Sequence, residues 1–114
     1  MSEQLSETRF KALAEKAIRD LEKSFARLAE DVDIDVEIEG DVLKIEFEEH
    51  EPGRFIVSPN SSARQVWVSA RVSSYKFDWS DETNDFILAA TGESLKAVME
   101  TLTREQLGDD GVEL

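Results

Sequence analysis

The spacing of apolar residues divides the chain into a helix, a run of strands and a second helix. From residue 5 to residue 28 the apolar side chains recur three and four positions apart, which is typical of one face of an amphipathic α-helix. Ser6, followed by an acidic residue, suits the N-cap of this helix. A second helix is predicted over residues 93–106, and residues 91–93 are predicted to form its start. We expect the tail, residues 108–114, to be loosely held.

Between the helices the apolar period falls to two, which predicts short, half-buried strands. Turn-forming residues separate these segments, so five or six strands are expected between residues 32 and 89. Short connections between successive strands imply an antiparallel meander. The two terminal helices are the available cover for one face of this sheet. The prediction is therefore a single α+β domain over residues 1–114, a two-layer sandwich in which the N- and C-terminal helices pack on one face of an antiparallel five- to six-stranded sheet.

The first two predicted strands flank Gly40-Asp41, a dipeptide suited to a two-residue hairpin turn. A turn at this position fixes the register of the hairpin. One face then receives three apolar pairs, which are Ile38 with Leu43, Val36 with Ile45, and Ile34 with Phe47. The other face receives charged pairs, which are Glu37 with Lys44, Asp35 with Glu46, and Asp33 with Glu48. Like charges directly opposite each other destabilise a sheet, so this hairpin keeps two repulsive rungs.

Composition and charge narrow the class of function. The chain has no cysteine, which excludes disulfides, thiolate metal ligands and a cysteine nucleophile. Its net charge is −13: residues 1–51 carry 16 acids and 7 bases, residues 52–79 carry 1 acid and 4 bases, and residues 80–114 carry 9 acids and 2 bases. Such a chain is unsuited to nucleic-acid backbones and is expected to bind cations or a basic protein surface. We see neither a membrane-length apolar run nor a signal peptide, and expect a cytoplasmic protein with no membrane partner.

The acidic strand is the first candidate site, because seven of the twelve residues from 30 to 41 are acidic and none is basic. Carboxylate oxygens are hard ligands that suit Ca²⁺, Mg²⁺, Mn²⁺ and iron, ferric iron above all. Outward neighbours on one strand sit about 7 Å apart, whereas cross-strand partners are about 5 Å apart between Cβ atoms. The better chelating pairs are therefore Asp35 with Glu46 and Asp33 with Glu48, and their exposure predicts weak, salt-sensitive binding. From charge alone, the alternative is a solvated strand face.

Trp67 is the second candidate. Alternation along residues 64–70 turns the valines toward the helices and leaves Trp67 on the uncovered face of the sheet. A tryptophan there either anchors an interface or lies flat across its neighbours, and the pattern leaves both open. The single histidine, His50, lies in a polar loop over residues 48–53. We find neither a Ser/His/Asp set nor a glycine-rich phosphate loop.

Five segments that follow the first helix together resemble the frataxin family, and most closely its bacterial CyaY branch. They are residues 31–38 (DVDIDVEI), 40–45 (GDVLKI), 65–69 (QVWVS), 75–79 (YKFDW) and 92–95 (GESL). The resemblance covers nearly the whole chain. Its most specific part is QVWVS with YKFDW, correctly spaced after the acidic strand.

This resemblance implies the fold predicted above and a role in iron–sulfur cluster assembly. Frataxins bind ferrous and ferric iron weakly on an acidic ridge, without an organic cofactor, and they bind the cysteine desulfurase of the assembly machinery and modulate its output. By the resemblance, the iron-binding ridge comprises Glu22, Glu30, Asp31, Asp33, Asp35 and Glu37. The cross-strand pairs add Glu46 and Glu48 to the predicted metal ligands.

The same resemblance implies contacts with the cysteine desulfurase and the iron–sulfur scaffold complex. The predicted partner-binding residues are Asp31, Asp33, Asp35, Asn60, Gln65, Trp67 and Lys76. Lys76 matches a family position that is often basic and faces partners. Ser58 and Asn60 stand where relatives carry an asparagine and a glutamine just ahead of the tryptophan strand.

The chain departs from the family pattern in its first helix. Lys23, Ala26, Arg27 and Ala29 occupy a region where the family usually has acids, and Lys11 replaces a histidine implicated in metal binding in some relatives. The predicted function is an iron-binding regulator, a non-enzyme that is monomeric and can form metal-induced oligomers. The alternatives are a ferroxidase that stores iron in oligomers and a small acidic adaptor that shares only the fold.

Overall fold

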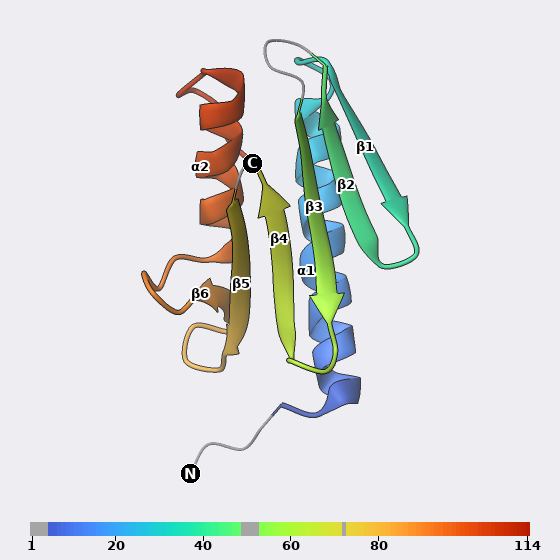
Figure 1. The fold of residues 1–114 in the computed structure, drawn as a ribbon, viewed down its shortest axis with the longest axis vertical. Coiled ribbons are helices and arrows are strands. Elements are labelled where there is room, and N and C mark those ends of the chain that lie inside the picture. The colour runs from blue at the N-terminus through green and yellow to red at the C-terminus, as the bar shows by residue number, and fades with distance from the viewer. Residues whose placement is uncertain (1–4, 49–52, 72) are drawn as a thin grey trace.

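The computed structural model describes residues 5–48, 53–71 and 73–114, and its elements follow the predicted order. They are α1 (Glu7–Leu28), β1 (Ile34–Glu39), β2 (Val42–Phe47), β3 (Gly53–Asn60), β4 (Gln65–Ala70), β5 (Ser73–Ser80), β6 (Asp85–Leu88) and α2 (Leu95–Leu107). The strands form one antiparallel sheet in the order β1-β2-β3-β4-β5-β6. Both helices pack on one face of this sheet (Figure 1), so the predicted two-layer α+β sandwich is confirmed, with six strands.

The first helix forms for the reasons read from the sequence. The side-chain oxygen of Ser6 accepts a hydrogen bond from the backbone N–H of Arg9 at 3.1 Å, which satisfies one of the free donors at the helix start. Its apolar stripe is buried against the sheet, as the period of three and four requires. The buried members of this stripe are Phe10, Ala14, Ile18, Leu21 and Phe25.

The register of the first hairpin is the one that the turn dictates. Gly40 adopts a φ of 65°, a left-handed conformation that glycine adopts without strain. The observed pairs include Ile38 with Leu43, Val36 with Ile45, Ile34 with Phe47 and Asp35 with Glu46. Alternation therefore sends the apolar side chains toward the helices and leaves the acidic ones on the open face.

The second helix begins two residues later than predicted. Ser94 is its N-cap and accepts a hydrogen bond from Ala97 N–H at 3.1 Å. Residues 91–93 precede this cap and lie outside the helix. The Glu93 carbonyl accepts a hydrogen bond from the Leu88 N–H of β6 at 2.9 Å. The helix ends at Gly108, whose φ of 64° gives it the left-handed cap expected of glycine. None of the described helices is long and apolar enough to span a membrane.

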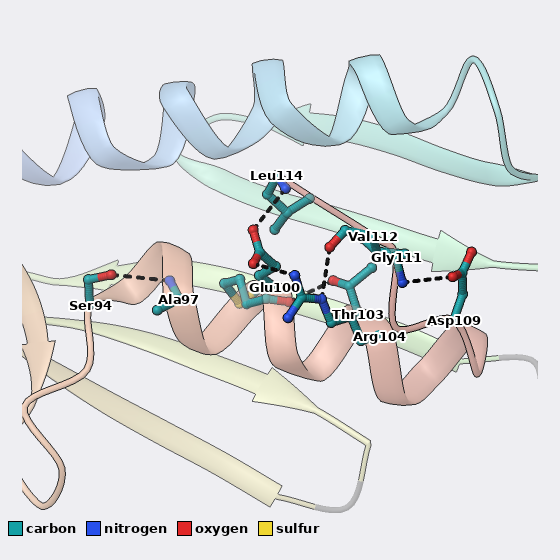
Figure 2. A network of polar contacts seen from close by, with 10 residues as sticks. Ser94, Ala97, Glu100, Thr103, Arg104, Asp109, Gly111, Val112 and Leu114 are labelled. Atoms are coloured by element: carbon teal, nitrogen blue, oxygen red, sulfur yellow. Dashed lines mark hydrogen bonds and ion pairs between the residues drawn. The ribbon is translucent and has the colours of Figure 1, made fainter.

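The prediction of a loosely held tail is wrong for its last residues. Val112 and Leu114 are buried, with 4% and 8% of their surface exposed. Arg104 Nε donates to the Val112 carbonyl at 2.8 Å, and the Leu114 N–H donates to Glu100 at 3.0 Å. Arg104 and Glu100 also form an ion pair of 2.8 Å with each other. Figure 2 shows Leu114 lying between the two helices, so these polar contacts hold an apolar end over the core.

His50 and the rest of segment 49–52 lie outside the described residues, so the loop predicted there is not described further.

We predict that Leu114→Ala lowers the free energy of unfolding by about 2 kcal/mol, because it removes buried apolar atoms from the space between the helices. Glu113→Ala is the matched control, since Glu113 is the exposed neighbour, and its effect should stay within about 0.5 kcal/mol. Urea unfolding measures both variants. Equal effects would show that the tail contributes nothing through burial.

Candidate functional site

A series of exposed carboxylates lies on and beside the first two strands, and we call it the acidic edge. It comprises Glu30, Asp31, Asp33, Asp35, Glu37, Glu46 and Glu48. All seven side chains are exposed, and they come from the connection between α1 and β1, from β1, and from β2 and the residue that follows it. The alternation that buries Ile34 and Ile45 puts the carboxylates of β1 and β2 on the open face.

The pKa of Glu48 reflects the repulsion among the carboxylates of the acidic edge. Its N–H lies 3.4 Å from the Asp33 carbonyl, which extends the hairpin by one rung as predicted. The negative charge of Asp35 and a hydrogen bond with it, followed by the charges of Asp33 and Glu46, raise the pKa of Glu48 above its ordinary value. The strongest carboxylate neighbour of Glu48 is therefore Asp35, its diagonal neighbour, rather than Asp33 directly opposite.

Two bases stand beside the acidic edge without neutralising it. Lys44 faces Glu37 in the register, but its ammonium pairs with Glu39 at 2.9 Å and lowers the pKa of that carboxyl through a hydrogen bond and its charge. Arg54 Nε lies 3.5 Å from Glu46, a loose and exposed pair. Among the residues that the structure describes, no ion pair reaches the other carboxylates of the edge. The edge is thus left with uncompensated negative charge.

Glu22 is placed differently from the strand carboxylates. It lines a hollow of about 450 Å³ between α1 and the β1–β2 turn, together with Lys11, Arg19 and Asp41. The bases in this hollow are paired within α1, Lys11 with Glu7 at 3.1 Å and Arg19 with Glu15 at 3.1 Å.

No preformed metal centre is visible in the described part of the chain. No three histidine, cysteine, aspartate or glutamate side chains among those residues come close enough to hold one ion. The carboxylates instead stand in neighbouring pairs on a strand surface. Such pairs suit a hard cation that keeps part of its water, or the basic side chains of another protein.

The second candidate lies at the centre of the open face, and we call it the tryptophan cluster: Gln65, Trp67, Lys76 and Asp78. Trp67 is the one large apolar side chain exposed among the described residues, at 37%. Its indole N–H donates to Gln65 Oε1 at 3.0 Å, and Gln65 Nε2 donates to Asp78 Oδ1 at 3.0 Å. Lys76 Nζ lies 4.9 Å from the centroid of the Trp67 ring.

This cluster holds the indole in a fixed orientation on the open face, as a prearranged anchor would require. Asp78 is not among the residues predicted from the sequence. The signal was available, because the alternation in β4 and β5 places Gln65 directly opposite Asp78. Asn60 lies beside Gln65 in the sheet, but its side-chain oxygen accepts the Ala63 N–H at 2.9 Å and so stabilises the β3–β4 turn.

Comparisons with known proteins agree with this architecture. A family model described as a frataxin-like domain matches residues 3–109. The chain is 33% identical over 108 residues to the "Iron-sulfur cluster assembly protein CyaY" of Azotobacter vinelandii, with 93% of each chain covered. It is 30% identical over 105 residues to the protein of the same name from Stutzerimonas stutzeri, with 92% of each covered. A solved frataxin from Psychromonas ingrahamii shares the fold, with a TM-score of 0.78 at 19% identity over 92% of this chain and 94% of that one.

Two helices packed on one face of an open, six-stranded antiparallel sheet are the fold of a frataxin-like domain. The chain belongs to the frataxin family, in its bacterial CyaY branch, and the resemblance drawn from the sequence is confirmed.

We predict that Glu48→Gln raises the melting temperature by a few degrees at neutral pH. A pKa that is raised in the folded state gives stability below the ordinary glutamate value of 4.5, and this stability is lost as the pH rises through the folded-state pKa. The advantage of the variant should therefore appear at neutral pH, shrink in high salt, and vanish in acid below that ordinary value.

Glu82→Gln is the control for this comparison, because Glu82 is exposed in the β5–β6 turn and far along the sheet from the edge. Thermal unfolding followed by circular dichroism at several pH values gives the comparison. A gain that did not depend on pH or salt would contradict the electrostatic interpretation.

Proposed function

We propose that this protein is a regulatory component of iron–sulfur cluster assembly that binds iron weakly at its acidic edge and docks there on a cysteine desulfurase. Its relatives are named as iron–sulfur cluster assembly proteins, which supports the general role. The observation that carries the finer proposal is the raised pKa of Glu48 within a row of carboxylates that lack neutralising bases in the described part of the chain. Carboxylates that repel each other are stabilised when a positively charged ligand binds between them.

Iron is the metal that we propose as the cargo of this surface. Carboxylate oxygens suit Fe²⁺ and, more strongly, Fe³⁺. The ligand set we propose is Glu30, Asp31, Asp33, Asp35, Glu37, Glu46 and Glu48, with Glu22 as a separate contributor from α1. Pairs such as Asp35 with Glu48 can move together to share an ion. Because no three potential ligands come together among the described residues, we expect the binding to be weak.

The same carboxylates suit the basic surface of a protein partner. Charge-assisted contacts at exposed positions chiefly set the rate of association and the orientation of a complex. Trp67, held by Gln65 and Lys76, would supply an apolar anchor farther along the same face, toward the scaffold complex. Asp31, Asp33 and Asp35 would then contact the desulfurase.

The donor geometry supports binding rather than catalysis. A ferroxidase needs iron held by converging ligands, whereas the described carboxylates are spread along two strands and the connection that precedes β1. The names of the relatives likewise describe an assembly protein and not an enzyme. We propose that the protein tunes the output of the desulfurase without chemistry of its own.

We predict that anaerobic addition of Fe²⁺ to the ¹⁵N-labelled protein shifts and broadens amide signals of residues 30–48 and leaves those of α2 unchanged. Asp35→Asn combined with Glu48→Gln should weaken this response, because it removes Glu48 and the carboxylate that repels it most. Glu82→Gln combined with Glu105→Gln removes as much charge at exposed positions elsewhere and serves as the control. Broadening spread evenly over the protein, or none at all, would overturn the iron proposal.

We predict that Asp33→Lys combined with Asp35→Lys weakens binding to the cysteine desulfurase at least about tenfold at low salt, because attraction becomes repulsion at the centre of the edge. Surface plasmon resonance with immobilised desulfurase measures the change. The control variant, Glu82→Lys with Glu105→Lys, makes the same change in net charge at exposed positions.

A second variant separates the two parts of this proposed interface. Trp67→Ala should weaken binding to the desulfurase–scaffold complex while keeping the salt dependence of the acidic edge. If reversal at the edge and reversal at the control positions weakened binding equally, only net charge would matter and the docking proposal would fall.

A further inference from the structure

Most, but not all, of the basic side chains of this acidic chain have a partner that offsets their charge. All 13 lysines and arginines lie in the described residues, and ten of them contact a carboxylate, a backbone or amide oxygen, or the Trp67 ring. Within the described residues the other three, Lys23, Arg27 and Lys96, form no ion pair. Arg27 only reaches Ser24 Oγ at 3.4 Å.

These three cations line one hollow. It has a volume of about 780 Å³ and lies between the second half of α1 and the start of α2. Its apolar lining includes Ala17, Leu21, Ala26 and Leu95. The helices α1 and α2, whose residues line most of this hollow, lie on the face of the sheet opposite the open face (Figure 1).

Two acids also line this hollow. Asp20 pairs with Lys16 at 2.8 Å. Asp85 accepts the backbone N–H of its neighbour Phe86 at 2.8 Å and keeps its negative charge. The hollow therefore keeps an excess of positive charge around an apolar floor, with three cations that form no ion pair in the described chain and one unpaired carboxylate, on a chain whose net charge is −13.

The helices disfavour this arrangement of cations at two places. Lys96 follows the N-cap Ser94 by two residues, in a first turn without acidic residues, and the helix dipole opposes a cation there. Lys23 and Arg27 are four residues apart on α1, a spacing at which like charges repel. The same spacing carries attractive pairs earlier in α1, at Glu7 with Lys11, Glu15 with Arg19 and Lys16 with Asp20. The dipole accounts for Arg27 in the last turn of α1 but not for the cluster.

We propose that the hollow between α1 and α2 docks an acidic peptide segment of a partner protein, with one apolar side chain on the floor and flanking carboxylates at Lys23, Arg27 and Lys96. Charge complementarity selects the acidic occupant, and the floor selects the apolar residue. The volume is within the range of about 300 to 1,000 Å³ of ligand pockets. A second copy of this chain is disfavoured as the occupant, since two molecules of charge −13 repel each other.

This site is independent of the acidic edge, and a partner that uses both surfaces must present a basic patch and an acidic segment. Such a pattern would orient the partner more strictly than a single charged surface does. In the reversed orientation, the acidic edge would repel the partner's acidic segment and the cations of the hollow would repel its basic patch.

The test is a titration of the ¹⁵N-labelled protein with the peptide acetyl-Asp-Glu-Leu-Glu-Asp-amide. We expect fast-exchange shifts of the amides of Lys23, Arg27 and Lys96, with affinity in the millimolar range that weakens as salt is added. Lys23→Gln combined with Lys96→Gln should weaken the affinity at least about fivefold, because two surface charge pairs are lost. Lys11→Gln, at an exposed and already paired lysine of the same helix, should change it less than about twofold.

Two further peptides separate the parts of the proposal. Acetyl-Asn-Gln-Leu-Gln-Asn-amide should not bind, and the acidic peptide with glycine in place of leucine should bind more weakly. Shifts outside the hollow, or shifts kept in the double variant, would overturn the site. Self-association in the absence of peptide that the double variant abolishes would overturn the proposed occupant and replace it with a second copy.

Discussion

Burial of one face of the sheet beneath α1 and α2 is the constraint on which the rest of this molecule depends. Each strand alternates, so every apolar side chain that enters the core sends its neighbour to the open face. Ile34 and Ile45 are buried, and Asp35 and Glu46 are consequently exposed and opposite each other. A slip of one residue would exchange the two faces and bury the carboxylates. The hydrophobic core thus holds the acidic edge in place despite its internal repulsion.

The charges of this protein are compensated unevenly, and two clusters of like charge lie on opposite layers of the fold. The acidic edge on the sheet has excess negative charge that raises the pKa of Glu48. The hollow between the helices keeps three cations without carboxylate partners in the described chain. Elsewhere, bases and acids are matched along α1 and at the Glu100–Arg104 pair. A cluster of like charges gains stability when a ligand of opposite charge binds, so both clusters are natural places for charged ligands.

The tryptophan cluster and the tail show how side-chain contacts between strands and helices complete the fold. Trp67 keeps its exposed position because Gln65 and Asp78 form a chain of hydrogen bonds across β4 and β5. The tail is held by Glu100 and Arg104, which contact its backbone while Leu114 covers the core. In both places a polar network orients an apolar side chain, once toward solvent and once toward the interior.

The sequence by itself determined the helices, the strands and the hairpin register, because these depend on local periods of 3.6 and two and on a turn at Gly40. It therefore also determined which face carries Asp35, Glu37 and Trp67. Only the tertiary structure decided that Lys44 pairs with Glu39 and not with Glu37, and that the tail returns to the core. It alone brought Lys96 of α2 to the cations of α1. These outcomes depend on side-chain rotamers and on contacts between segments far apart in the chain, which no local period can specify.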